Sequence, residues 1–219
     1  MPSYSGVFTL QAQMQAIAAG TWTGIPRAIG SAYGGGFYAG QISTAGNGIA
    51  DYNLVVGPIS TAQSQLQWKT SNTSTTGTTS VIDGPTNSSN MNNASHPCGQ
   101  FCEGLTIGGF SDWYMPAKNE LEVCYYNLKP STNNNNTSSG INANAVPARA
   151  SNYTTGDPAQ TSSTDFKDTG TQDFETQVYW SSTETSSTNA ALQQFITGNQ
   201  YTYAKATSLR VRAIRRVAV

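Results

Sequence analysis

The spacing of hydrophobic residues changes along the chain, and each change marks a predicted element. Between residues 116 and 128 the apolar positions recur at i, i+3, i+4 and i+7, at Leu121, Cys124, Tyr125 and Leu128. This spacing predicts an α-helix with one buried face. Pro116 suits the first position of that helix because its missing N–H leaves no bond unmade there. A shorter helix is predicted over 94–105, where Phe101 and Leu105 lie four residues apart.

The C-terminal part follows a period of two, which is typical of half-buried strands. The predicted strands cover 178–183, 190–197, 200–205 and 209–217. In the last of them Leu209, Val211, Ala213 and Val217 alternate with Arg210, Arg212 and Arg216. Residues 29–56 are also strand-like and contain three consecutive glycines from Gly34 to Gly36. No Gly-Lys-Ser/Thr follows them, so a hairpin or bulge is favoured over a phosphate loop.

Two long polar stretches interrupt these elements. Residues 60–95 form a predicted insertion anchored by Leu66 and Trp68, and residues 131–177 form a second. The second is too long for a simple connection, and its scattered aromatic residues favour an ordered loop excursion. Residues 1–27 read as an arm with a short helix, in which Leu10, Met14 and Ile17 follow helical spacing. Such a helix suits either an anchor on another protein or a helix docked on its own domain.

Composition narrows the possible partners. The 219 residues carry a net charge of −1, and only 11% are charged, against a norm of roughly 25%. Nucleic acid is not an expected partner because no basic stripe is present. No apolar run approaches the roughly 18 residues of a membrane span. No Lys or Arg precedes Arg27 and no sustained apolar core follows the start, so no signal peptide is expected.

Catalytic and metal-binding patterns are sparse. The three cysteines, Cys98, Cys102 and Cys124, lack zinc spacing. They suit buried apolar positions, or a bridge from Cys124 to one of the other two. The single His96 has no neighbouring acid or nucleophile and is expected at a helix entry. We therefore expect no cofactor, no metal and no enzymatic activity. A glycosidase remains an alternative, because its two catalytic carboxylates can come from distant parts of the chain and need no fixed spacing in the sequence.

The acids are densest between residues 165 and 175, at Asp165, Asp168, Asp173 and Glu175. This group lacks the glycine and closing glutamate of a calcium-binding loop. The tripeptides Glu-Pro-Asn, Gln-Pro-Asp and Trp-Asn-Asp, which calcium-dependent sugar-binding lectins use, are absent from the sequence. Sugar recognition without a metal stays open, because aromatic faces and amide groups are the chemistry that sugars require.

Two segments carry a family resemblance. The first is Gly-Gly-Phe-Ser-Asp-Trp-Tyr-Met-Pro-Ala-Lys-Asn-Glu-Leu from Gly108, and the second runs from Tyr179 through Trp180 to Arg216. Together they resemble the C-terminal domain family of collagen-like (Lcl) adhesins, also found in bacteriophage tail-fibre and virion proteins. The resemblance implies an α+β, C-type-lectin-like fold in which two helices pack on a twisted antiparallel sheet with long polar loop insertions. It also implies that Trp113 and Trp180 lie in the core.

Sulfatase-modifying enzymes share this fold, and their helix start is similar to the segment from Pro116. Their activity depends on cysteines late in the domain, and no cysteine follows Cys124. That activity is not expected here.

The first residues of the chain resemble those of proteins found in virus particles. Residues 6–16, with the following Gly-Thr-Trp, resemble the start of many bacteriophage tail and virion proteins. We therefore expect an anchoring arm at 1–27 that contacts other virion proteins and a lectin-like domain at 28–219, with synthesis in the bacterial cytoplasm and a final place in the virion. Two roles remain open: attachment to a host-surface polysaccharide, or a purely structural role in subunit packing. The family and phage fibres often form trimers, which implies a homotrimer.

The predicted ligand contacts lie on the strand over 200–205. Alternation places Tyr201, Tyr203 and Lys205 on one side of it. We predict that these three, with Asn199 and Tyr153, contact a ligand. The alternative is that Tyr201 and Tyr203 face the core.

Overall fold

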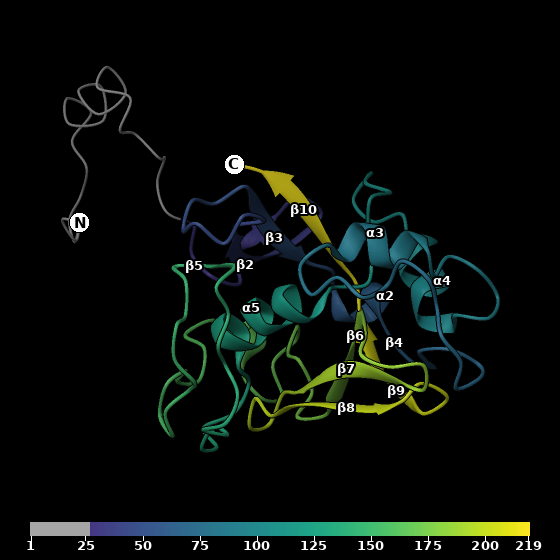
Figure 1. The fold of residues 1–219 in the computed structure, drawn as a ribbon. Coiled ribbons are helices and arrows are strands. Elements are labelled where there is room, and N and C mark those ends of the chain that lie inside the picture. Colours follow the sequence, from purple (N-terminus) through teal and green to yellow (C-terminus); the bar gives the residue numbers. More distant parts are fainter. Residues whose placement is uncertain (1–26) are drawn as a thin grey trace.

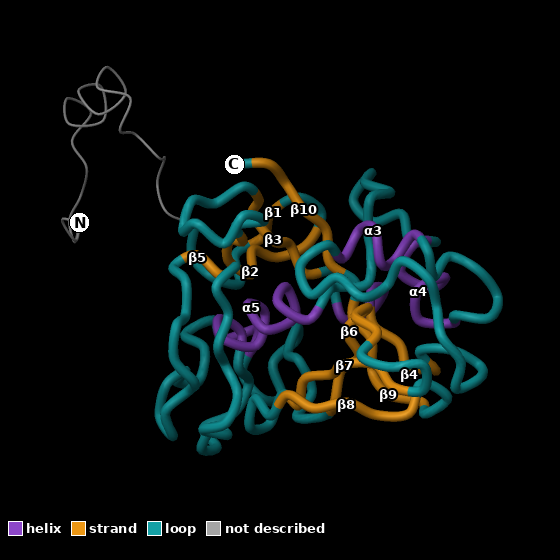
Figure 2. The backbone as a smooth tube through the Cα atoms, viewed as in Figure 1, coloured by secondary structure: helices purple, strands orange, loops and turns teal. Residues whose placement is uncertain are grey.

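The computed structural model describes residues 27–219, and the predicted arm at 1–27 lies outside them except for Arg27. The domain is α+β, as predicted (Figures 1 and 2). Its helices are α2 (Ile59–Ala62), α3 (Gly84–Ser89), α4 (Pro97–Glu103), α5 (Lys118–Leu128) and the 3₁₀ turn η1 (Thr164–Phe166). No helix within residues 27–219 is long and apolar enough to cross a membrane.

The strands form two five-stranded sheets instead of the single sheet that was expected. The first contains β1 (Ala32–Tyr33), β2 (Gly36–Ile42), β3 (Tyr52–Val56) and β10 (Ile214–Ala218) in that order, with β5 (Ala145–Val146) paired to β2. The second has the order β4 (Gln63–Gln67), β9 (Ser208–Arg212), β6 (Val178–Glu184), β7 (Asn189–Gln194) and β8 (Gln200–Ala204). All pairs are antiparallel except β6 with β9.

The predicted strand over 209–217 is divided at Ala213, and its halves belong to different sheets. The backbone N–H of Ala213 donates to Ala62 O at 2.9 Å, and Gly57 N–H donates to Ala213 O at 3.0 Å. At Ala213, where the chain passes from one sheet to the other, these two bonds take the place of the regular hydrogen bonds between neighbouring strands. Arg212 was expected opposite the apolar face, but it is 1% exposed. Its guanidinium lies 4.8 Å from the Phe174 ring centroid, which offsets part of the cost of burying the charge.

Helix α5 packs against β2 of one sheet and against β6 and β7 of the other (Figure 1). Leu121 and Tyr125 of this helix belong to one core cluster with Phe195, which directly follows β7 of the second sheet. Trp113 and Trp180 are 1% and 0% exposed and lie together in a second cluster, so their predicted burial is confirmed.

Both helix starts differ slightly from the predictions. Helix α5 begins at Lys118, two residues after Pro116, because the Glu120 carboxylate accepts the Ala117 N–H at 2.8 Å. Helix α4 begins at Pro97, with His96 as the residue before it. A proline at the first helical position fits the rule that its missing donor is not needed there.

The two polar stretches are ordered, but in different ways. Residues 60–95 contain β4 and α3, so they complete a sheet instead of forming an insertion. The run Gln-Ser-Gln-Leu-Gln of β4 is mostly polar and gave no strand signal. Residues 131–177 are a loop excursion, as expected. They are held by aromatic side chains that are at most 4% exposed, namely Tyr153, Phe166 and Phe174.

The glycine run forms the hairpin between β1 and β2, as predicted. Gly36 has no room for a side chain, since an added Cβ would lie 2.3 Å from the carbonyl oxygen of Val56. We expect Gly36→Ala to lower the free energy of unfolding by about 1–3 kcal/mol, the usual cost of overpacking. Gly156→Ala is the control because open space surrounds that position. Urea unfolding of both variants measures the difference, and equal stabilities would contradict the close approach.

Candidate functional site

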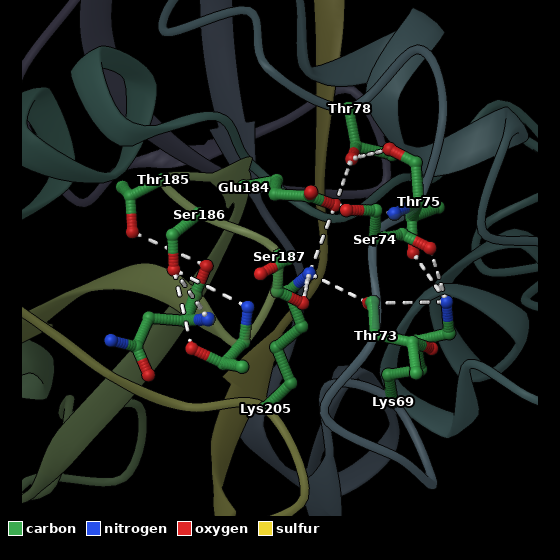
Figure 3. Close-up of polar contacts among 12 residues, drawn as sticks. Lys69, Thr73, Ser74, Thr75, Thr78, Glu184, Thr185, Ser186, Ser187 and Lys205 are labelled. Carbon is green, nitrogen blue, oxygen red and sulfur yellow. Dashed lines mark hydrogen bonds and ion pairs between the residues drawn. The ribbon is translucent and has the colours of Figure 1, made fainter.

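A cluster of buried charges lies where the β6–β7 turn, the end of β8 and residues 69–78 meet (Figure 3). The Lys205 ammonium is fully buried and forms an ion pair with the Glu184 carboxylate at 3.0 Å. It also donates to the carbonyl oxygens of Thr73 and Ser187, both at 2.9 Å. All three ammonium hydrogens therefore have acceptors.

A second buried lysine continues this cluster. Lys69 Nζ donates to Ser74 O at 2.6 Å, to Thr73 O at 3.2 Å and to Thr75 Oγ1 at 3.1 Å. Thr75 Oγ1 also lies 2.8 Å from His96 Nε2. The backbone N–H of Thr75 donates to Glu184 Oε2 at 2.6 Å. We call Lys69, Thr75, His96, Glu184 and Lys205 the lysine cluster.

The electrostatics of the lysine cluster keep its histidine neutral. Burial, followed by the positive charges of Lys69 and Lys205, lowers the pKa of His96 from 6.5 to about 4. Burial also lowers the pKa of Lys205, and Glu184 opposes that change. The neutral imidazole donates from Nδ1 to Asn93 Oδ1 and accepts the Thr75 hydroxyl at Nε2. The cluster thus joins three surface segments through satisfied polar groups.

The structure separates the five predicted ligand contacts. Tyr201 and Tyr203 are 36% and 51% exposed, although their cross-strand partners Leu192 and Ala190 are core residues. Lys205 is buried because β8 ends at Ala204, and the alternation that placed Lys205 beside the tyrosines stops there.

The two remaining candidates do not lie with the tyrosines on β8. Tyr153 is 4% exposed, and its hydroxyl donates to Glu122 Oε1 at 2.7 Å inside the domain. Burial and the Glu122 charge raise the pKa of Tyr153 far above its usual value. Asn199 is half-buried in the β7–β8 turn, where its carbonyl accepts the Gln194 N–H at 2.9 Å. Neither Tyr153 nor Lys205 offers a free polar group to a ligand.

The exposed tyrosines form the candidate binding surface. They alternate on β8, opposite Leu192 and Ala190 of β7, so both rings lie on the same face. Next to Tyr203, the turn from Thr185 to Thr188 presents four exposed hydroxyl side chains. We call Tyr201, Tyr203 and this turn the β8 surface. It combines aromatic faces with neutral hydroxyl groups, and the lysine cluster lies beneath its turn.

Apart from Lys205, no residue of the lysine cluster was predicted from the sequence. Lys69, His96, Glu184 and Lys205 are each isolated among polar residues, and up to 136 positions separate them along the chain. Their convergence depends on β4 joining the second sheet, because Lys69 N–H then donates to Lys205 O at 3.2 Å. This pairing could not be predicted because β4 consists mainly of Gln and Ser and has no alternation of apolar residues.

The other candidate chemical groups are engaged within the domain. Cys98, Cys102 and Cys124 are free and buried, which confirms the buried-apolar interpretation over a bridge. Burial raises the pKa of all three thiols. Glu175 of the acidic group pairs with Arg210 at 2.6 Å. Within residues 27–219, no set of three or more His, Cys, Asp or Glu side chains is placed to hold a metal ion.

These features define a class: an α+β domain of two sheets around a central helix, with polar loops ordered by buried ion pairs. The chain belongs to the Lcl C-terminal domain family, which matches it over residues 58–215. This family relationship supports an adhesin-like domain. The match includes β4 and α3, in agreement with their part in the fold. Comparison with curated proteins gave no match.

The Lys205–Glu184 pair gives a stability prediction. We expect Lys205→Met to lower the free energy of unfolding by about 3–5 kcal/mol, because Glu184 is left buried and unpaired. Adding Glu184→Gln should recover at least about 1 kcal/mol of that loss. Arg210→Met is the control, because its pair with Glu175 is about one-third exposed and should contribute under about 1 kcal/mol. Chemical denaturation of the unchanged protein and the three variants tests this. A double variant as unstable as Lys205→Met alone would contradict the prediction.

His96 gives a pH prediction. Its folded pKa of about 4 lies below the unfolded value of 6.5, so the unfolded chain binds more protons between these values. Stability should therefore rise with pH from about 4 to 6.5. His96→Gln should remove about 2 kcal/mol of this rise, and since His96 is the single histidine, no other imidazole obscures it. Melting curves across this range measure the effect, and parallel profiles for the two proteins would rule it out.

Proposed function

We propose that this domain binds carbohydrate on a bacterial surface, without a metal, through the β8 surface. The observation that carries this proposal is the exposure of Tyr201 and Tyr203 on one face of a strand whose backbone is held by β7. Aromatic faces pack against the apolar face of sugar rings. They do so at low entropic cost here, since a tyrosine has only two side-chain torsions.

The polar surroundings of the tyrosines also favour a neutral sugar-like ligand. The turn from Thr185 to Thr188 has hydroxyl side chains that can donate or accept hydrogen bonds. The buried charges beneath it are satisfied by protein groups, so they fix the turn in place and leave recognition to neutral groups. We propose a binding role without catalysis, in which Lys205 and Tyr153 position the surface from below and do not contact the ligand.

The setting we propose is a bacteriophage virion, as a tail fibre or an exposed decoration. The support is the resemblance of residues 6–16 to the start of tail and virion proteins, joined to an adhesin-family domain. Residues 1–27 would then attach the chain to other virion proteins, and the domain would assemble as a homo-oligomer. A purely structural role in subunit packing is the alternative, and the binding experiment below separates the two.

We expect Tyr201→Ala and Tyr203→Ala each to weaken binding to host-surface polysaccharide by about tenfold, or ~1.4 kcal/mol, through loss of aromatic contact. Tyr203→Phe should retain most of the affinity because the ring remains. Glycan-array screening followed by calorimetry on the best ligand, with and without a chelator, measures this.

Ile49→Ala is the matched control for the tyrosine variants, because Ile49 is 68% exposed and lies in the turn between β2 and β3. It should bind as the unchanged protein does. Absence of binding to any host glycan or host cell, together with many copies covering the particle, would favour the structural role.

A further inference from the structure

The connection between β2 and β3 contains Asn47 followed by Gly48, the one Asn-Gly pair in the sequence. Both residues are exposed. Gly48 has a φ of +79°, and a Cβ added there would meet nothing within 4 Å. Because glycine has no side chain to shield its own backbone nitrogen, the Gly48 N–H is open to solvent and to the asparagine side chain before it.

The Asn47 side chain is folded back along the backbone that follows it. Its Oδ1 accepts the Ile49 N–H at 3.0 Å, which is the turn that asparagine commonly makes with the residue two positions on. The Ser43 hydroxyl donates to the same Oδ1 at 2.9 Å. Two donors therefore meet at one carbonyl oxygen, beside an open backbone nitrogen.

The Ser43 donor is fixed by the loop excursion at 131–177. Ser43 is 0% exposed. Its backbone N–H donates to Asn144 O at 2.7 Å, and its carbonyl accepts a hydrogen bond from Asn144 Nδ2 at 2.8 Å. The hydroxyl is therefore already in place when charge develops on the Asn47 oxygen. Within residues 27–219, neither Asn47 Nδ2 nor the Gly48 N–H donates a hydrogen bond, so both are free to react.

We propose that Asn47 is a site of spontaneous deamidation, a covalent modification whose co-reactant is water. A solvent base takes the Gly48 N–H proton, and the nitrogen attacks Asn47 Cγ, which closes a cyclic imide. The bond from Cγ to Nδ2 breaks, and Nδ2 takes a proton from water and leaves as ammonia. Water then adds to one of the two imide carbonyls and opens the ring, which leaves an aspartate or an isoaspartate at position 47.

The two donors on Oδ1 assist the attack. Negative charge develops on this oxygen as the Gly48 nitrogen approaches Cγ, and the Ser43 hydroxyl and the Ile49 N–H already point at it. Donors placed in advance where charge develops lower the barrier of a reaction. The fold therefore adds to the reactivity that the Asn-Gly pair has in any flexible chain, and the Ser43 hydroxyl is the part of this assistance that a substitution can remove.

The modification changes charge at one place in the domain. It adds one carboxylate, which makes the net charge one unit more negative than −1. Next to it, the Asp51 carboxylate still accepts the Thr44 N–H at 2.6 Å and the Thr44 hydroxyl at 2.5 Å. The connection between β2 and β3 belongs to the first sheet and β8 to the second (Figure 1). The inference is therefore independent of the function proposed for the β8 surface.

Incubation of the full chain in mildly alkaline buffer, followed by digestion and mass spectrometry, tests the site. The peptide with Asn47 should gain the mass difference between ammonia and water at least about tenfold faster than the peptide with Asn152, which is exposed but precedes the bulky Tyr153. Gly48→Ala should slow the change at Asn47 by about tenfold or more. A rate at Asn47 no higher than at Asn152, or no slowing in Gly48→Ala, would overturn the proposal.

Ser43→Ala tests the assistance by the fold, because it removes the hydroxyl and keeps the backbone bonds to Asn144. In native buffer it should slow deamidation of Asn47 by about two- to tenfold, the effect of one lost hydrogen bond. In concentrated urea the two proteins should react equally fast, since Ser43 is no longer held beside Asn47. Thr44→Ala is the matched control, because the Thr44 hydroxyl bonds to Asp51, and its native rate should stay unchanged. A native rate in Ser43→Ala that equals that of the unchanged protein, or equal slowing in Thr44→Ala, would overturn the role of Ser43.

Discussion

The crossing of one backbone segment between two sheets is the constraint on which this domain depends. At Ala213 the chain leaves β9 and enters β10, and it bonds there to Gly57 and Ala62. Because both sheets share this segment, neither can shift without breaking the hydrogen bonds at the crossing. Arg212 before it and Arg216 after it fix the register on either side, through Gly57 O and the Glu120 carboxylate.

Several of the domain's few charges are buried as pairs. Glu120 and Glu122 of α5 are 0% exposed and bind Arg216 and Arg149. Glu120 thereby ties the helix to the last strand, and Glu122 ties it to the loop excursion at 131–177. Burying such pairs adds little net stability, because the lost hydration roughly offsets the attraction. Their effect is to select one geometry, since a different packing would leave a buried charge without its partner.

Residues whose environment is local could be predicted from the sequence, and those whose environment is set at long range could not. The apolar stripe of α5, the burial of Trp113 and Trp180 and the glycine hairpin follow from short patterns. The exposed tyrosines of β8 were among the predicted contacts. Lys205 was misplaced because alternation says nothing about where a strand ends. The division at Ala213 was missed because an apolar residue continues the alternation whether or not the chain changes sheets.

The two lysines beneath the β8 surface have one further consequence. Each holds backbone carbonyls of the surface loops in the way that a bound cation would. A cation carried on a side chain is covalently attached, so neither dilution nor competition from salts can remove it. The shape of the loops between Thr73 and Thr75 and around Ser187 is therefore independent of the ionic composition outside the protein. The domain would keep this surface folded in media of different mineral content.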